Sequence, residues 1–215
     1  MRNIWWVLVR FGFRLLYNEL AFTYDAVSYF VSLGEWRCWQ RTALKYLDIH
    51  KSSRILELAY GTGNLQLDLQ NKGFNAIGID VSAFMGNITR KKLLEHGRTP
   101  RLIRGMAQQL PFACERFSAI ICTFPTEFIF EKVTLNEINR VLQPGGQLII
   151  VLNGDFCGNG IVESGLEGLY HITGQRGGNN LHFSAFFTAF GFDTQAFNEP
   201  CPRSVAQVIV AIKRD

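Results

Sequence analysis

The amino-acid sequence predicts an α/β protein built on a doubly wound, mostly parallel sheet of seven strands. Three observations support this fold class. Apolar segments of strand length alternate with helical patterns along most of the chain. A glycine-rich turn follows the first of these segments, and two strand-like segments close the chain with no helix between them. Strands that alternate with helices form a parallel sheet covered on both faces, and the closing pair predicts a terminal antiparallel hairpin.

The expected elements follow in chain order. Helical patterns cover residues 3–33, with a break, and then 35–47. Pro144 and Gly145 end a later helix, and Gly146 opens the strand after it. The sequence divides into an N-terminal helical cap, residues 1–47, and a core domain, residues 48–215. In the core, strands are expected at 54–58, 75–79, 101–104, 117–122, 147–152, 193–197 and 204–213, and helices at 64–71, 83–96, 135–142 and 180–190.

Length and composition fit one soluble enzyme domain. The chain has 215 residues, 47% of them hydrophobic, which is enough for one large core and a small addition. The net charge is only +4 and the basic residues are dispersed, so we expect no nucleic-acid partner. The five cysteines are scattered, odd in number and without C-x-x-C spacing. This predicts free thiols in a reducing cytoplasm and neither a disulfide framework nor a metal site.

A glycine-rich turn after the first expected strand is the most informative local feature. The strand ends at Glu57, and the segment Ala59-Tyr60-Gly61-Thr62-Gly63 follows. Glycine lets the backbone approach a ligand closely, and the next helix offers free N–H groups to polar ligand atoms. Asp80 stands at the tip of the second strand, where a carboxylate suits the hydroxyls of a ribose. The pattern predicts a nucleoside-type cofactor across two βα units.

The spacing argues against two other nucleotide motifs. In a dinucleotide fingerprint that starts at Gly61, the third glycine would be Gln66. A P-loop requires Gly-Lys followed by Ser or Thr, and this triplet is absent.

The pattern acid-x-small-x-Gly-x-Gly resembles motif I of the class I S-adenosylmethionine (SAM) dependent methyltransferases, which have a Rossmann-like sheet. Residues 80–85, 104–112 and 137–146 are similar to further segments of that family, in the same order and spacing. The resemblance implies SAM as the cofactor, with an acid near the turn serving its ammonium group. The cofactor-binding residues that it implies are Tyr24, Glu57, Ala59, Gly61, Gly63, Asp80, Val81, Ser82, Met85, Met106, Ala107 and Thr123.

Two of these positions depart from the family pattern. Ala59 replaces a glycine, and we expect a negative φ there that an alanine tolerates. Met106 replaces an aspartate that commonly accepts a hydrogen bond from the adenine amino group, and a thioether is a weak acceptor. Gln108 is a candidate substitute acceptor. A catalytically silent SAM-binding regulatory or interaction protein is therefore the alternative to a methyltransferase.

Residues 24–39 resemble the N-terminal region of the ubiquinone and menaquinone C-methyltransferases, where it covers the SAM pocket. Ser28 and Trp36 stand where that branch usually has an asparagine and a histidine, and residues 124–128 do not match its Gly-Arg-Asn segment. The resemblance implies a small, apolar or lipid-like methyl acceptor, and leaves C-, N- and O-methylation open.

The candidate residues of the substrate pocket are Tyr24, Glu127 and His171, and each has a structural alternative. Tyr24 is otherwise a core aromatic, Glu127 a carboxylate at a helix N-terminus, and His171 a surface histidine. We assign no catalytic residue, because methyl transfer from a sulfonium is an in-line displacement that positioning and desolvation accelerate.

Residues 1–17 predict an amphipathic helix. Arg2, Arg10 and Arg14 fall on one face of it, opposite an apolar stripe. The uncharged run is too short for a transmembrane helix. Three roles remain open: peripheral contact with a membrane surface, a lid over the active-site mouth, and packing against a homodimer partner. We expect a cytoplasmic enzyme that associates with membranes if the first role applies.

Overall fold

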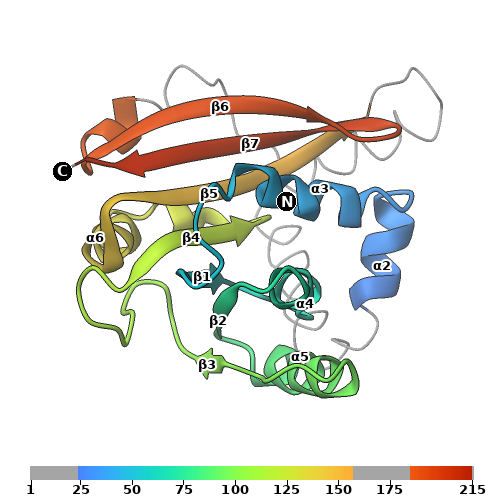
Figure 1. Ribbon diagram of the computed structural model, residues 1–215. Helices are drawn as coiled ribbons and strands as arrows, with labels where there is room; N and C mark the ends of the chain where they lie inside the picture. The colour runs from blue at the N-terminus through green and yellow to red at the C-terminus, as the bar shows by residue number, and fades with distance from the viewer. Residues whose placement is uncertain (1–23, 157–184, 215) are drawn as a thin grey trace, which may run out of the picture.

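The computed structural model describes residues 24–156 and 185–214 (Figure 1). The expected helix over residues 1–17, His171, Cys157 and the first part of the helix expected at 180–190 lie outside the described residues. Within the described part of the chain, no helix is long and apolar enough to cross a membrane.

A seven-stranded sheet with the order β3-β2-β1-β4-β5-β7-β6 forms the centre of the molecule. Strands β1 to β5 pair in parallel, whereas β7 runs antiparallel to both β5 and β6. This confirms the predicted doubly wound sheet with a terminal antiparallel hairpin. The strands are β1 (Arg54–Leu58), β2 (Asn75–Asp80), β3 (Leu102–Arg104), β4 (Phe117–Thr123), β5 (Leu142–Phe156), β6 (Phe192–Pro200) and β7 (Ser204–Lys213).

Helices accompany the sheet, as Figure 1 shows. They are α2 (Tyr24–Val31), α3 (Trp36–Thr42), η2 (Ala43–Tyr46), α4 (Asn64–Asn71), α5 (Ala83–Glu95), η3 (Glu127–Phe130) and α6 (Lys132–Val141), and residues 185–188 are also helical.

Two apolar clusters, one on each face of the sheet, form the core. Because side chains alternate along a strand, Leu56 and Ile120 join one cluster, whereas Ile55 and Ile121 join the other. The first cluster includes Ile138 of α6, and the second includes residues of α3 and α4. This arrangement leaves the carboxyl ends of β1, β2 and β4 at one edge of the sheet, where a ligand site is expected.

The junction between α6 and β5 differs from the prediction. The helix ends at Val141, and β5 begins at once with Leu142, which pairs with Phe117. Gln147 then pairs with Ala119, so a bulge that contains Gly145 at φ +68° separates the two pairs. The strand start predicted near residue 147 is the end of this bulge. Pro144 and Gly145 indicate a turn, but they do not show that Leu142 already pairs with Phe117 before it.

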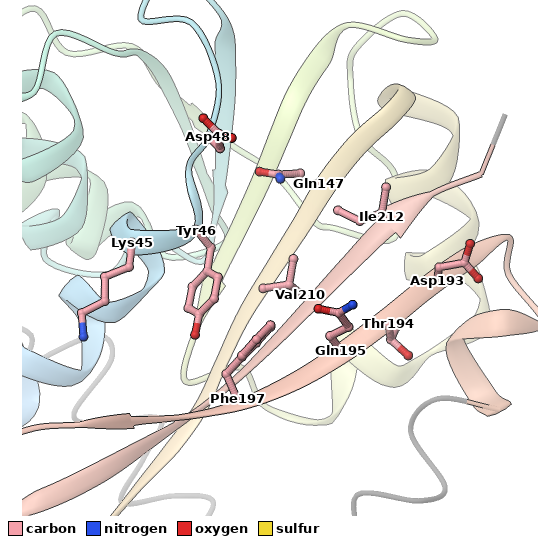
Figure 2. A pocket seen from close by; sticks show the side chains of 10 residues that line it. All are labelled: Lys45, Tyr46, Asp48, Gln147, Asp193, Thr194, Gln195, Phe197, Val210 and Ile212. Atoms are coloured by element: carbon pink, nitrogen blue, oxygen red, sulfur yellow. The ribbon is translucent and has the colours of Figure 1, made fainter.

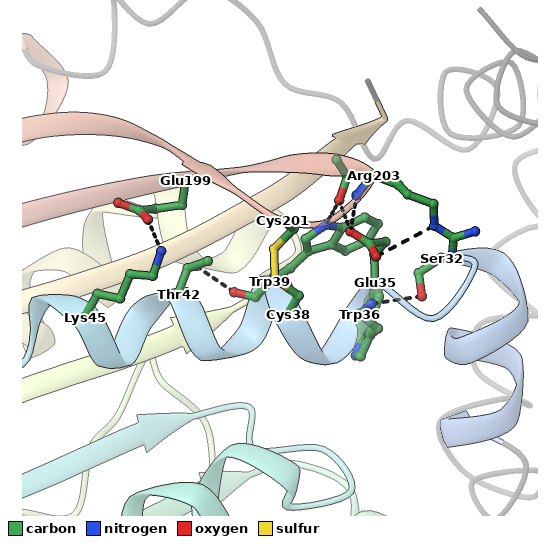
Figure 3. Close-up of a disulfide and its surroundings, with 11 residues drawn as sticks. Ser32, Glu35, Trp36, Cys38, Trp39, Thr42, Lys45, Glu199, Cys201 and Arg203 are labelled. Atoms are coloured by element: carbon green, nitrogen blue, oxygen red, sulfur yellow. Dashed lines mark hydrogen bonds and ion pairs between the residues drawn. A yellow bond between two sulfur atoms is a disulfide. The ribbon is translucent and has the colours of Figure 1, made fainter. Parts of the chain in front are cut away.

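Cys38 of α3 and Cys201 in the turn between β6 and β7 form a disulfide (Figure 3), with their Cα atoms 6.0 Å apart. The prediction that the cysteines are free thiols is therefore wrong for this pair. The two residues are 163 positions apart in sequence, and their spacing could not show that α3 lies against the hairpin turn. Among the described cysteines, Cys114 and Cys122 are free.

Hydrogen bonds fasten α3 to the same turn (Figure 3). The indole Nε1 of buried Trp39 donates to Ser204 Oγ over 2.7 Å. Ser204 Oγ in turn donates to Glu35 Oε2 over 2.6 Å, and the Arg203 backbone N–H donates to the same oxygen over 3.1 Å. These contacts fix α3, and with it Trp36 and Arg37, beside the carboxyl edge of the sheet.

Candidate cofactor site

The turn between β1 and α4 brings the predicted glycines close to α5. The N–H of Gly63 donates to Tyr60 O over 2.9 Å, which closes the turn. Gly63 has φ +77°, and a Cβ at this position would stand 2.3 Å from Thr89 Cγ2, so only glycine fits. Thr89 Oγ1 donates to Gly61 O over 2.7 Å, and α5 therefore holds the turn from one side.

Asp80 connects this turn to the start of α5. Its Oδ2 accepts from the Gly61 N–H over 2.9 Å, and its Oδ1 accepts from the Ser82 N–H over 2.8 Å. Burial raises the pKa of Asp80, although both of these N–H groups act in the opposite direction. Ser82 caps α5 by accepting from the Met85 N–H over 3.3 Å. The structure thus brings together Gly61, Asp80, Ser82 and Met85, four of the residues that were expected to bind the cofactor.

Ala59 does not have the backbone conformation that we expected. Its φ is +53° rather than negative. The Ala59 N–H still donates to Ile79 O over 2.8 Å, as the last bond of the pairing between β1 and β2, so the turn toward α4 has to begin at this residue. A non-glycine residue in the left-handed region costs about 1 kcal/mol or more. The departure from the family's glycine is therefore strained rather than mild.

Glu57 is buried beneath the turn and lacks a full set of partners. Burial raises the pKa of Glu57 to about 8, and the side chain is 1% exposed. Its Oε2 has no hydrogen-bond partner among the described residues, and neither does the amide nitrogen or oxygen of fully buried Gln66. Buried polar groups are ordinarily hydrogen-bonded, so an incoming donor such as an ammonium group would satisfy the unpaired oxygens of Glu57 and Gln66.

A hollow of about 190 Å³ lies beside the turn and is lined by residues of α2, of α3 and of the start of α4. Arg37 lines it, with its guanidinium donating to Gln40 Oε1 and Asp68 Oδ2 over 3.0 and 2.6 Å. A guanidinium has five N–H donors, so some remain for a carboxylate. The other lining residues are Asp25, Tyr29, Gly34, Trp36 and Asn64. Asp25, Arg37 and Asn64 were not predicted as site residues, although the charges of Asp25 and Arg37 within residues 24–39 were a usable signal.

Aromatic side chains cover the end of β4. The rings of Trp36 and Phe124 lie 3.9 Å apart between centroids, and Tyr24 packs edge-on against Trp36 at 6.2 Å. Phe124 has φ +52° and follows Thr123, a buried residue that was predicted to bind the cofactor. Tyr24 is only partly buried, so it borders this aromatic cluster (Tyr24, Trp36 and Phe124) rather than filling the main core.

The residues expected around adenine follow β2 and β3, which are neighbours in the sheet. Val81 and Met106 are largely exposed, at 60% and 55%, whereas Ala107 is buried. Gln108, the candidate substitute acceptor, donates its amide to Glu131 Oε2 over 2.9 Å. Exposed apolar groups at this place offer a surface on which a flat ring can pack.

The candidates for the substrate pocket are only partly placed. Glu127 is exposed as the first residue of η3, which also fits its alternative role at a helix N-terminus. Tyr24 lies in the aromatic cluster, and His171 is outside the described residues.

A second, larger hollow of about 420 Å³ lies on the antiparallel side of the sheet (Figure 2). Its cation Lys45 pairs with Glu199, which also accepts a hydrogen bond from Tyr46. The lining comes from β5, β6, β7 and residues 45–48 and shares no residue with the β1–α4 turn. This hollow is therefore separate from the cofactor site.

Comparison with known proteins agrees with this geometry. Residues 13–156 match the model of the ubiE/COQ5 methyltransferase family. The ubiquinone/menaquinone biosynthesis C-methyltransferase UbiE of Coxiella burnetii is 32% identical over 143 residues, which are 63% of this chain and 57% of that protein. The demethylmenaquinone methyltransferase of Thermus thermophilus is 33% identical over 139 residues, 63% of each chain. The chain thus spans about three fifths of the length of these curated relatives.

Solved structures show the same fold. The YcgJ protein of Bacillus subtilis has a TM-score of 0.63 at 18% identity, covering 83% of this chain and 99% of its own. Phosphoethanolamine N-methyltransferase 2 of Haemonchus contortus, in complex with phosphomonomethylethanolamine and S-adenosylhomocysteine, has a TM-score of 0.63 at 15% identity, covering 85% of this chain and 53% of its own. The fold is that of the SAM-dependent methyltransferases, and the chain belongs to the ubiE/COQ5 methyltransferase family.

Proposed function

We propose that this protein is a SAM-dependent methyltransferase that binds its cofactor at the β1–α4 turn. The observation that carries the proposal is the position of Asp80. Its carboxylate accepts hydrogen bonds from the N–H of Gly61 in the turn and from the N–H of Ser82 at the start of α5. A carboxylate has about four acceptor directions, so Asp80 keeps capacity for the two hydroxyls of a ribose. Family membership supports the same cofactor.

The residues present fit the amino-acid end of SAM. The Arg37 guanidinium borders the hollow beside the turn and suits a carboxylate. The incompletely paired Glu57 and Gln66 offer acceptors to an ammonium group. Ala59, Gly61 and Gly63 would run beneath this end of the cofactor, and Val81, Met85, Met106 and Ala107 would border its adenine. When bound, SAM supplies an electrophilic methyl group on a sulfonium.

We propose an apolar, aromatic methyl acceptor of the quinone type. The aromatic cluster at the end of β4 supplies flat apolar faces next to Thr123, and aromatic rings stack on such faces. The related proteins from Coxiella burnetii and Thermus thermophilus are named for ubiquinone and menaquinone substrates. Tyr24, Glu127 and His171 remain our candidates for contacts with the acceptor.

The role of the N-terminal part is also a proposal. We propose that residues 1–47 form a cap over the site, and that the protein is cytoplasmic with peripheral membrane contact through its first helix. The arginine face and apolar stripe within residues 1–17 support membrane contact, and the same helix is the proposed contact of a homodimer if it packs against a second copy.

Two measurements test the proposed function. Calorimetric titration with S-adenosylhomocysteine should show binding to the wild-type protein. Incubation with methyl-labelled SAM and a naphthoquinol lacking its ring methyl group should then give a methylated product, identified by mass spectrometry. Binding without transfer, either to this quinol or to any component of a cell extract, would identify a silent SAM-binding protein. Absence of binding would refute the cofactor assignment.

A further inference from the structure

Asp25, in the first turn of α2, connects the cap to the cofactor turn. Its Oδ1 accepts from Thr62 Oγ1 over 2.6 Å and from Asn64 Nδ2 over 2.9 Å. Its Oδ2 pairs with Lys92 Nζ over 2.9 Å. Lys92 also donates to Asn64 Oδ1 over 2.7 Å, so the four side chains form one closed network.

The network keeps Asp25 charged. Partial burial alone would raise the pKa of Asp25, but hydrogen bonds from Thr62 and Lys92 and the charge of Lys92 outweigh it and lower that pKa. A carboxylate therefore faces these donors at neutral pH. Hydrogen bonds to charged groups are stronger than those between neutral groups. The Asp25 side chain is 45% exposed, which weakens the ion pair with Lys92, so the bonds from Thr62 and Asn64 are the main contribution of Asp25 to the position of α2.

The partners of Asp25 belong to the elements that would hold the cofactor. Thr62 stands between Gly61 and Gly63 and is buried, and Asn64 is the first residue of α4. Asp80 holds Gly61 through its N–H and Thr89 holds it through its carbonyl. Asp25 is thus a third fixing point of the turn, and it comes from the cap.

We infer that Asp25 is a positioning residue, which fixes the cofactor turn and keeps α2 closed over the hollow beside it. This inference rests on the proposed function, because it assumes that the turn binds SAM. When the Asp25 contacts are lost, α2 moves away more readily and Thr62 loses its acceptor. The cofactor then dissociates faster, while the sheet that carries the turn stays folded.

The contacts that hold α3 do not involve Asp25, so the role of Asp25 can be distinguished from a general effect on folding. The neighbouring helix α3 is held by the Cys38–Cys201 disulfide and by the Glu35–Ser204 hydrogen bond. Removing the Asp25 carboxylate leaves these contacts intact. We therefore expect the change to affect cofactor affinity much more than the turnover rate of the bound complex.

The test compares Asp25→Asn with the wild-type full-length protein. The amide adds a donor where Thr62, Asn64 and Lys92 already donate. The dissociation constant for S-adenosylhomocysteine, measured by calorimetry, should rise about tenfold or more. The KM for SAM should rise similarly, while kcat at saturating SAM should change by less than about twofold. Asp193→Asn, which removes a surface pair with Arg214, is the matched control. It should leave the dissociation constant, the KM for SAM and kcat unchanged.

A second pair of variants covers the case in which Asp25→Asn fails to fold. Thr62→Val removes only the hydroxyl that Asp25 accepts from, and should weaken binding several-fold, whereas Thr62→Ser keeps the hydroxyl and should restore it. Wild-type affinity in both Asp25→Asn and Thr62→Val would overturn the inference. A loss of kcat with an unchanged KM for SAM would also overturn it. If the wild-type protein itself binds no S-adenosylhomocysteine, the proposed function fails instead.

Discussion

Gly154 of β5 and Trp39 of α3 meet so closely that no side chain fits between them. A Cβ at Gly154 would stand 2.0 Å from Trp39 Cε2. The indole is almost fully buried, and its Nε1 reaches Ser204 in β7. The position of α3, and therefore of Trp36 and Arg37 beside the cofactor turn, depends on this contact.

Gly154→Ala should accordingly destabilise the protein by about 1–3 kcal/mol, the usual cost of overpacking a core. The free energy of unfolding from urea titration measures this. In a Trp39→Leu background the indole is gone, and the same substitution should cost less than about 0.5 kcal/mol. Equal costs in both backgrounds would show that the two residues do not interact.

Asp80→Ala should weaken binding of S-adenosylhomocysteine by about tenfold or more. The reason is that two ribose hydroxyls lose their acceptor, which costs on the order of 1–3 kcal/mol. Calorimetric titration measures the change, with Asp193→Ala as the control at a remote exposed carboxylate. Unchanged affinity in Asp80→Ala, or a preference of the wild-type protein for NAD, would contradict the assignment.

Ala59→Gly should raise the free energy of unfolding by about 0.5–1 kcal/mol. Glycine adopts φ +53° without strain, and this gain exceeds the entropy that glycine adds to the unfolded chain. The comparison variant is Ala83→Gly at the start of α5, where the same substitution lacks that strain to relieve and should not stabilise. Thermal unfolding of both variants decides the point, and destabilisation by Ala59→Gly would mean that the alanine is unstrained.

Glu57 should make the protein less stable as pH rises. Its pKa is about 8 in the folded protein against 4.5 for the free side chain, because burial disfavours the charged form. Between these values the folded state holds a proton that the unfolded state has lost, so the contribution of Glu57 falls from pH 4.5 through pH 8. Asp80, Arg37 and Asp68 are the charges that also act on it.

Glu57→Gln keeps the shape of the side chain and removes its titration. The variant should match the wild-type protein near pH 5 and exceed it in stability above pH 8. Urea titrations at both pH values test this. A constant difference between the two proteins across the range would show that Glu57 does not titrate there.

Loss of the Cys38–Cys201 disulfide should destabilise the protein by about 2–5 kcal/mol, since it closes a long loop in the unfolded chain. The double variant Cys38→Ser/Cys201→Ser should unfold at a lower temperature than the oxidised wild-type protein. Dithiothreitol should lower the unfolding temperature of the wild-type protein to that of the double variant. Cys114→Ser, at an exposed free thiol, should have no such effect. If dithiothreitol leaves the unfolding temperature of the wild-type protein unchanged, the two cysteines are not paired.

Local patterns predicted the fold well. The bounds of β1, α4 and β7 agree with the prediction at both ends, because apolar periodicity and glycine or proline signals act over a few residues. The order of the motifs also predicted that the turn after β1 and the end of β2 lie at one edge of the sheet, but not the hydrogen bond from Gly61 to Asp80. Strand β5 extends past its predicted C-terminal end, and β6 past both of its ends, because pairing with β7 continues past the apolar run.

What the sequence could not show depends on contacts between distant positions. The Ala59 N–H bonds to Ile79 O of a neighbouring strand while its φ is +53°, and the network of Asp25 joins residues up to 67 positions apart. Neither relationship leaves a periodic signal. The expected roles of residues 1–17 and His171 stay predictions, as they lie outside the described residues.

The disulfide also defines a covalent ring within the sheet. Residues 38–201 lie inside this ring and contain β1 to β6, whereas β7 begins after it, at Ser204. Yet β7 lies between β5 and β6, and pairs with both. A ring that closes before β7 pairs therefore holds two strands whose facing edges are open, and open edges invite pairing with other chains. Strand β7, which lies outside the ring, thus covers the open edges of β5 and β6, two strands inside it.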